Sequence, residues 1–230
     1  MKISDRKIGL FTKDNVYCDI AKNVIKHNFS NYRIIKGNLE DQNESIYQTK
    51  FDYIIAFLYH KIIPETILKN ARIAAINFHP APTSYPGGGY SFALYNRDNI
   101  FGTTCHHMEK KPDTGKVISE KKFPMYQTDT FVTLKERTMI YTLVNFFEII
   151  HLILEKRDLP ESKEQWKREP LTHKDLESQV LELTLEMSTE EIDRRIRAAN
   201  PDYPGPFIEI NGKRYTLRPE KYLKSFVFGK

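Results

Sequence analysis

The sequence predicts an α/β fold in which helices flank a mostly parallel sheet. Short apolar runs of strand length alternate with segments of helical periodicity in the first half of the chain, and such alternation builds parallel sheets. Residues 51–57 (FDYIIAF) are almost continuously apolar, as expected of a strand buried on both faces. Near its end the chain changes to a capped helix and a hairpin, which predicts a small additional subdomain.

The composition is that of a folded protein of ordinary size. Of the 230 residues, 40% are hydrophobic and 28% are charged, close to average globular usage. The formal net charge of +5 would attract a phosphorylated partner through the long-range field. Basic residues are nevertheless interleaved with acidic ones, unlike the clustered stripe of a nucleic-acid-binding protein. We therefore expect no nucleic-acid partner.

Several features favour a cytoplasmic protein. Cys18 and Cys105 are the only cysteines and lack CxxC spacing, which is typical of reduced thiols. The first residues, MKISDRKIGLF, contain charges where a signal peptide has an apolar core. The longest apolar segment, 140–154, contains polar residues and is shorter than the roughly 20 residues of a membrane span. We expect no membrane association.

The first elements follow from apolar periodicity. Strands are expected at residues 7–11, 33–35 and 51–57, and helices at 14–27 and 65–70, the latter with Pro64 suited to its first turn. The core-facing side chains of the first helix would be Val16, Ile20, Val24 and Ile25. No GxGxxG pattern follows the first strand, so a nicotinamide cofactor has little support.

A fourth apolar run, 72–76, ends abruptly in a loop rich in proline and glycine, within INFHPAPTSYPGGGY at 76–90. Asn77 and His79 lie two residues apart and so project from one face of a strand. Ligands usually bind at the carboxyl ends of strands in open α/β sheets, and histidine titrates near neutrality as a general base should. We predict a catalytic edge here, although such a histidine is often only a hydrogen-bonded loop residue.

Two other segments of the sequence are expected to lie next to this predicted catalytic edge. The turn Tyr59 to Ile62 leaves an adjacent strand and would wall the same pocket, unless it is only a strand-to-helix connection. Gly87 to Gly89 lack the Lys-Ser/Thr of a P-loop, so they favour a flexible turn before a helix at 91–96 over a phosphate cradle.

Residues 101–108 alternate as a strand that places His106 and His107 on opposite faces, which argues against a zinc site made from both. The loop 109–115 carries Asp113 and precedes a returning strand at 116–123. A carboxylate beside His79 would orient the imidazole and stabilise its charged form. A solvated loop carboxylate is the ordinary alternative.

The remaining elements complete the predicted fold. A helix from 128 or 129 to about 157 carries an apolar stripe that suits the core first and a dimer face second: Met139, Leu143, Phe146, Phe147, Ile150, Ile153 and Leu154. Trp166 is expected to pin the polar connector 157–170. Ser188 opens a capping box, and Asn211-Gly212 suits a type I′ hairpin turn. We place a boundary between a domain at 1–186 and a C-terminal subdomain at 187–230.

Asn77-x-His79, followed by Asp113-Thr114-Gly115, resembles the Asn/His/Asp constellation of the folate-dependent formyltransferases. IDRRIRAA (192–199), PDYPGPF (201–207), the hairpin INGKRYTL and NFHPAPTSYPGGG look like the sugar-nucleotide N-formyltransferase branch. The resemblance covers most of the chain from Phe51 onward. It implies a Rossmann-like catalytic domain, N10-formyltetrahydrofolate as co-substrate and no metal.

Carried over residue by residue, the resemblance implies that His79 accepts a proton as the sugar amine attacks the formyl carbon. Asn77 would donate to the developing oxyanion, and Asp113 would orient His79. The folate would lie against Tyr59, His60, Lys61, Ile62, Glu109 and Lys111. The amino sugar would approach over Tyr85, Gly87, Gly88 and Tyr90.

The resemblance therefore implies an enzyme that formylates a nucleotide-linked amino sugar for lipopolysaccharide O-antigen, with dTDP-4-amino-4,6-dideoxyglucose as the best candidate. The hydrophobic helix and the hairpin lead us to expect a homodimer. A formyltetrahydrofolate hydrolase would use water in place of the amine, but such members usually carry an amino-terminal regulatory domain. A non-catalytic folate- or nucleotide-binding module would keep the pocket, yet has no need of all three residues. A methionyl-tRNA formyltransferase is expected to continue into a tRNA-binding domain, whereas thirty residues follow Asn200.

Overall fold

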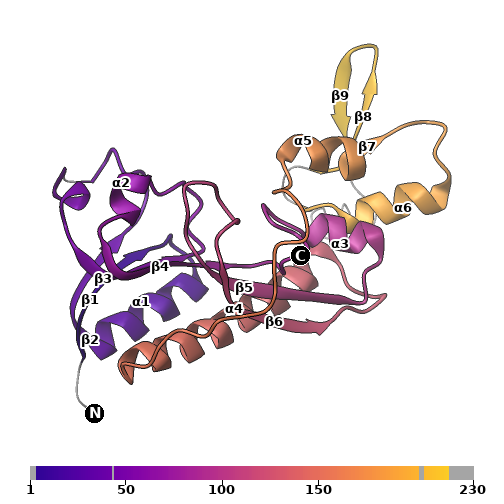
Figure 1. Ribbon diagram of the computed structural model, residues 1–230. Helices are drawn as coiled ribbons and strands as arrows, with labels where there is room; N and C mark the ends of the chain where they lie inside the picture. Colours follow the sequence, from indigo (N-terminus) through magenta and orange to yellow (C-terminus); the bar gives the residue numbers. More distant parts are fainter. Residues whose placement is uncertain (1–3, 43, 202–204, 218–230) are drawn as a thin grey trace, which may run out of the picture. The chain divides into compact units, whose positions relative to one another are not determined.

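The computed structural model describes residues 4–42, 44–201 and 205–217 (Figure 1). The chain divides into two compact units, each made of separate stretches. Unit 1 comprises residues up to 87, 102–122 and 138–170, and unit 2 comprises 88–101, 123–137 and the chain from 171. The domain boundary expected at residue 186 stays a prediction.

A six-stranded sheet confirms the predicted mostly parallel α/β fold. Its spatial order is β2-β1-β3-β4-β5-β6. The pairs among the first four strands are parallel, whereas β5 runs antiparallel to β4. The strand bounds are β1 Ser4–Phe11, β2 Phe29–Ile35, β3 Phe51–Phe57, β4 Ala71–His79, β5 Ile100–His107 and β6 Val117–Pro124.

Both faces of β3 are covered, as its apolar run predicts. Ile54 and Ala56 belong to a buried cluster that includes side chains of η1 (Glu44–Tyr47) and α2 (Glu65–Leu68). Phe57 points to the other face, where its ring centroid lies 5.0 Å from that of Phe146 in α4 (Phe131–Leu154). Figure 1 shows α1 (Val16–Asn28) and α4 on this second face. Unit 1 is therefore a three-layer arrangement around the parallel strands.

The buried face of α1 differs from the predicted one. The helix begins after Asn15, whose side chain accepts the N–H of Cys18. The prediction that Val16 and Ile20 face the core was wrong, because Val16 is 64% exposed and Ile20 is also exposed. Small residues let the helix approach the sheet instead. Its buried side chains are Cys18, Ala21 and Ile25.

The helix α4 is a core helix, as predicted. It is long and apolar enough to cross a membrane, the one such helix among the described residues, but 50% of its most apolar stretch is buried. Leu143, Phe146 and Ile150 are buried. Phe147, predicted to face inward, is 45% exposed. With Ile140 and Val144, which are also exposed, it forms an apolar row on the outside of α4, called the outer row below.

Unit 2 contains the predicted capped helix and hairpin. The Ser188 side chain accepts the N–H of Glu191 at the start of α6 (Thr189–Ala198). The hairpin strands β8 (Phe207–Ile210) and β9 (Lys213–Thr216) are antiparallel. Asn211 and Gly212 have φ of 51° and 73°, which confirms the tight turn with positive φ at both central residues. The strand β7 (Glu182–Leu183) pairs parallel to β8.

Polar and aromatic contacts join α3 (Tyr90–Asn96) to α6 within unit 2. The Tyr95 hydroxyl donates to a Glu191 carboxylate oxygen at 2.8 Å. The Arg194 guanidinium lies 4.0 Å from the centroid of the Tyr95 ring. The remaining elements of the unit are α5 (His173–Leu176) and the π-helix η2 (Glu177–Leu181).

We expect Phe146→Ala to lower the free energy of unfolding by about 3–5 kcal/mol, because it removes a fully buried ring that packs against Phe57 and Phe78. Phe147→Ala, one residue along and outward-facing, is the matched control and should change it by less than about 1 kcal/mol. Urea unfolding followed by circular dichroism measures both. Equal losses for the two variants would contradict this assignment of the core face.

Candidate functional site

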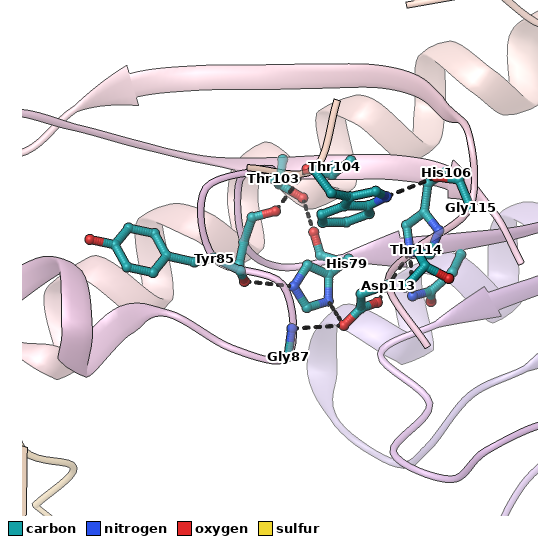
Figure 2. Close-up of polar contacts among 12 residues, drawn as sticks. His79, Tyr85, Gly87, Thr103, Thr104, His106, Asp113, Thr114 and Gly115 are labelled. Carbon is teal, nitrogen blue, oxygen red and sulfur yellow. Dashed lines mark hydrogen bonds and ion pairs between the residues drawn. The ribbon is translucent and has the colours of Figure 1, made fainter. Parts of the chain in front are cut away.

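The predicted catalytic edge lies where β4 meets β5 in unit 1. The antiparallel register places Asn77 opposite His106 and His79 opposite Thr104. Residues that face one another on neighbouring strands project to the same side of a sheet. Polar side chains of both strands therefore gather where β4 ends and the loop 80–87 begins (Figure 2).

Asp113 joins this cluster from the loop between β5 and β6. Its carboxylate Oδ2 lies 3.4 Å from His79 Nδ1 and accepts the backbone N–H of Gly87 at 2.9 Å. The other oxygen, Oδ1, lies 3.2 Å from His106 Nε2. Asp113 is 9% exposed and has φ of 51°. The structure thus places the carboxylate beside His79 and away from bulk solvent.

His106 is a member of the site that the sequence analysis missed. Its ring is 2% exposed, its Nδ1 lies 2.8 Å from the His107 carbonyl oxygen, and its Nε2 lies 3.1 Å from the Asn77 amide nitrogen. Strand alternation assigns His106 and His107 to opposite faces, as expected. His106 lies opposite Asn77 because β5 pairs antiparallel to β4 in this register. No local sequence pattern predicts that pairing. No group of three or more His, Cys, Asp or Glu among the described residues could hold a metal ion.

Trp166 and Gly115 support the loop that carries Asp113. The indole N–H of Trp166 donates to the Gly115 carbonyl at 2.8 Å, which pins the connector as predicted. The same ring stands edge-on to His106 and His79, with centroid distances of 5.0 and 6.0 Å. A side chain at position 115 would collide with the His107 carbonyl oxygen, so only glycine fits at this position of the loop.

Two buried threonines of β5 hold the backbone at the end of β4. The Thr103 hydroxyl donates to the His79 carbonyl at 2.8 Å, and the Thr104 hydroxyl donates to the Ala81 carbonyl at 2.9 Å. Adjacent strand residues project to opposite faces, so the segment is held from both sides. This arrangement limits the positions open to the His79 ring.

The electrostatics favour a neutral imidazole next to an ionised carboxylate. Burial lowers the pKa of His79; the Asp113 carboxylate opposes that effect, and a charge on His106 would add to it. Burial alone would raise the pKa of Asp113, but His79, His106 and the Gly87 amide together lower it below its usual range. His79 Nε2 lies 3.4 Å from the Tyr85 carbonyl oxygen, the same distance that separates Nδ1 from the Asp113 carboxylate, but the carboxylate is charged and so is the stronger acceptor. With Nδ1–H on Asp113, Nε2 is available as a base.

The residues expected to contact folate lie mostly on the surface of unit 1. Tyr59 is partly buried against Phe11, and its hydroxyl donates to the Gly37 carbonyl at 2.8 Å. Lys111 forms an ion pair with Glu169. The other members of this predicted set are exposed: His60, Lys61, Ile62 and Glu109.

The residues expected to contact the sugar divide between the two units. Figure 2 shows the Tyr85 ring directed away from His79 while its carbonyl faces the imidazole. Tyr85 is 2% exposed, so its ring contributes to packing. Gly87 reaches Asp113 through its backbone. In unit 2, Gly88 has φ of 133°, and the Tyr90 ring packs against two aromatic rings, those of Phe101 and Phe131.

Comparisons with known proteins bear on this geometry. A family model described as formyl transferase matches residues 11–142, more than half of the 230 residues. The matched stretch contains the whole β4 and β5 edge and the loop that carries Asp113.

Individual proteins add detail. The chain is 28% identical to a methionyl-tRNA formyltransferase of Lactobacillus gasseri over 95% of its own length and 69% of that protein. Its fold matches a sugar N-formyltransferase of Shewanella with a TM-score of 0.73 at 16% identity, over 93% of this chain and 97% of the other. A Helicobacter canadensis N-formyltransferase, solved with folinic acid and dTDP-3-aminofucose, matches with a TM-score of 0.67 at 17% identity, over 90% and 85%. At such identities these two likenesses establish the fold.

Proposed function

Because the chain belongs to the formyl transferase family, we propose that it transfers a formyl group from N10-formyltetrahydrofolate to the amino group of a nucleotide-linked amino sugar. The observation that carries the reaction type is the buried His79, whose Nδ1 lies beside the ionised Asp113 while Asn77 projects from the same face of β4. The best candidate acceptor is dTDP-4-amino-4,6-dideoxyglucose. The family resemblance of the tail and loop motifs supports this choice.

The proposed reaction needs a base, an oxyanion donor and an orienting carboxylate. The amine attacks the formyl carbon, and the carbonyl oxygen becomes an oxyanion that receives an N–H of Asn77. His79 Nε2 takes the proton that the amine loses, while Asp113 stabilises the resulting imidazolium. Collapse of the intermediate breaks the bond between the formyl carbon and N10, and N10 leaves with that proton. A preorganised oxyanion donor is worth about 2.7–4 kcal/mol in other enzymes.

The contacts with the two substrates are part of the proposal. We assign the folate to the turn Tyr59 to Ile62 and the loop Glu109 to Asp113, since both are largely exposed next to strand ends. We assign the sugar to the segment Tyr85 to Tyr90. Exposed Gly87 lets backbone approach a ligand closely. We place the enzyme in the cytoplasm, in keeping with the buried free thiols of Cys18 and Cys105.

Methionyl-tRNA formyl transfer is the second candidate. The sequence similarity to the Lactobacillus gasseri protein, which extends over 95% of this chain, favours it. The sugar acceptor is favoured by the structural likeness to the Shewanella sugar N-formyltransferase, with a TM-score of 0.73. Both acceptors present an amine, so the same catalytic groups would serve either.

The test of the acceptor is a panel assay with N10-formyltetrahydrofolate as donor. The acceptors are dTDP- and UDP-linked 3-amino and 4-amino sugars and methionyl-tRNA, and mass spectrometry detects the added formyl group. We expect formylation of a dTDP-linked 4-amino sugar. Formylation of methionyl-tRNA alone would overturn the sugar assignment, and folate hydrolysis without any acceptor would overturn the transferase assignment.

We expect His79→Ala to lower kcat/KM about 10²–10⁴-fold, because it removes the base. Asn77→Ala should lower it about 10²–10³-fold by removing the oxyanion donor. Asp113→Ala should leave His79 without its orienting partner and also abolish most activity. His107→Ala is the matched control, because His107 projects from the opposite face of β5. Circular dichroism checks folding, and a fully active His79→Ala enzyme would refute the mechanism.

We also propose that the protein is a homodimer. The apolar side chains of the outer row, Ile140, Val144 and Phe147, are exposed along one side of α4. A second copy of the chain could pack against this row. Light scattering should give twice the monomer mass, and Phe147→Asp should shift that mass towards the monomer. A monomeric wild-type protein at all concentrations would reject the dimer.

A further inference from the structure

Part of the connector 157–170 contacts both loops of the candidate site. The indole N–H of Trp166 donates to the carbonyl of Gly115, in the loop that carries Asp113. The backbone N–H of the next residue, Lys167, donates at 3.1 Å to the carbonyl of Thr83, in the loop 80–87. Two adjacent residues therefore contact two loops that are far apart in the sequence. Residues 162–168 are called the strap below.

Each of these contacts lies close in the sequence to a group on the Asp113 carboxylate. Gly115 is two residues beyond Asp113 itself. Thr83 is four residues before Gly87, whose backbone N–H donates to Asp113 Oδ2 at 2.9 Å. A movement of either loop would therefore change the position of Asp113 relative to His79.

Thr83 is also held from the sheet, by Glu120 of β6. The backbone N–H and the hydroxyl of Thr83 both donate to Glu120 Oε1, at 2.7 and 2.9 Å. The Glu120 side chain is 2% exposed, and a buried carboxylate persists only with such partners. Its Oε2 lies 2.8 Å from Lys122 Nζ, which lies 2.6 Å from a carboxylate oxygen of Glu164 in the strap. Thr83 is thus a fixed point for the strap.

Aromatic and backbone contacts hold the rest of the strap. The Trp166 ring is inclined at 73° to that of His79 and at 85° to that of His106, so it packs edge-to-face with both imidazoles. The Arg168 guanidinium lies 5.1 Å from the centroid of the Tyr85 ring. The Ser162 N–H donates to the carbonyl of Val117, where β6 begins, at 3.2 Å.

We propose that the strap holds the two loops at a fixed separation and that Trp166 is a positioning residue for formyl transfer. This role rests on the proposed function. Trp166 acts through Gly115 and through the two imidazole rings it packs against. A displacement of catalytic groups by about 1 Å can cost about 10²-fold in rate, so the separation of the loops matters for the reaction. Release of the strap from either loop would be enough to lose that separation.

The contacts of the strap can be tested without any substrate. Trp166 is the only tryptophan, so the full-length protein gives one indole N–H signal in ¹⁵N NMR. We expect this proton to exchange with solvent at least about tenfold more slowly than that of N-acetyltryptophanamide, because it is bonded to Gly115. Lys167→Pro removes the donor to Thr83 and should speed the exchange. Wild-type exchange as fast as that of the free indole would overturn the inference, whatever the substrate.

Glu161→Gln is the matched control for these variants. Glu161 lies one residue before the strap and pairs with Lys116, and both side chains are largely exposed. A pair of this kind contributes little to stability. The exchange of the Trp166 indole and the rate of formyl transfer should both stay at their wild-type values.

The positioning role is tested by kinetics. Trp166→Phe keeps a flat ring but has no N–H. We expect Trp166→Phe and Lys167→Pro each to lower kcat about 10–100-fold with little change in KM. Because release of either end is sufficient, the double variant should lose no more than the worse single variant. Additive losses, or a raised KM with kcat unchanged, would refute the role of the strap.

Two further outcomes are distinguishable. Circular dichroism checks that the variants fold, and Trp166→Phe alone decides the question if Lys167→Pro does not fold, since an unchanged kcat would then refute the positioning role. Absence of formyl transfer by the wild-type protein would refute the proposed function and leave the exchange result standing.

Discussion

The buried carboxylate of Asp113 is the interaction on which the site depends. Removing an ionised carboxylate from water costs several kcal/mol, so it persists only with donors around it. The three partners come from different parts of unit 1: His79 from β4, His106 from β5 and the Gly87 backbone from the loop after β4. One charge therefore holds together the strand edge and both of its loops.

The surroundings of Asp113 restrict its position. Gly115 allows the loop to close against the His107 carbonyl, and Trp166 donates to the Gly115 carbonyl from a distant part of the chain. Thr103 and Thr104 fix the backbone that carries His79. These supports are buried or backbone-directed, which is the condition for holding catalytic groups within a fraction of an ångström.

The same geometry accounts for how one family can formylate unlike acceptors. In the proposed reaction, a neutral base, an ionised carboxylate and an amide donor act on an amine and a formyl carbon, whatever carries the amine. The choice between a sugar and a tRNA must then come from residues outside this cluster. In unit 1 the turn Tyr59 to Ile62, Glu109 and Lys111 are assigned to folate in the proposed function, so they would serve either acceptor.

The sequence by itself determined the approximate positions of most strands of the large sheet, the Ser188 cap and the Asn211-Gly212 turn, because each depends on a local period or on one residue's conformational preference. It also determined that Asn77 and His79 share a face, since that follows from a period of two. The tertiary structure decided which strands are neighbours. Antiparallel pairing of β5 with β4 is a long-range choice, and it alone places His106 between Asn77 and Asp113. It also decided that α1 buries Cys18 and Ala21 instead of Val16 and Ile20, because close packing on the sheet favours small side chains over the most apolar ones.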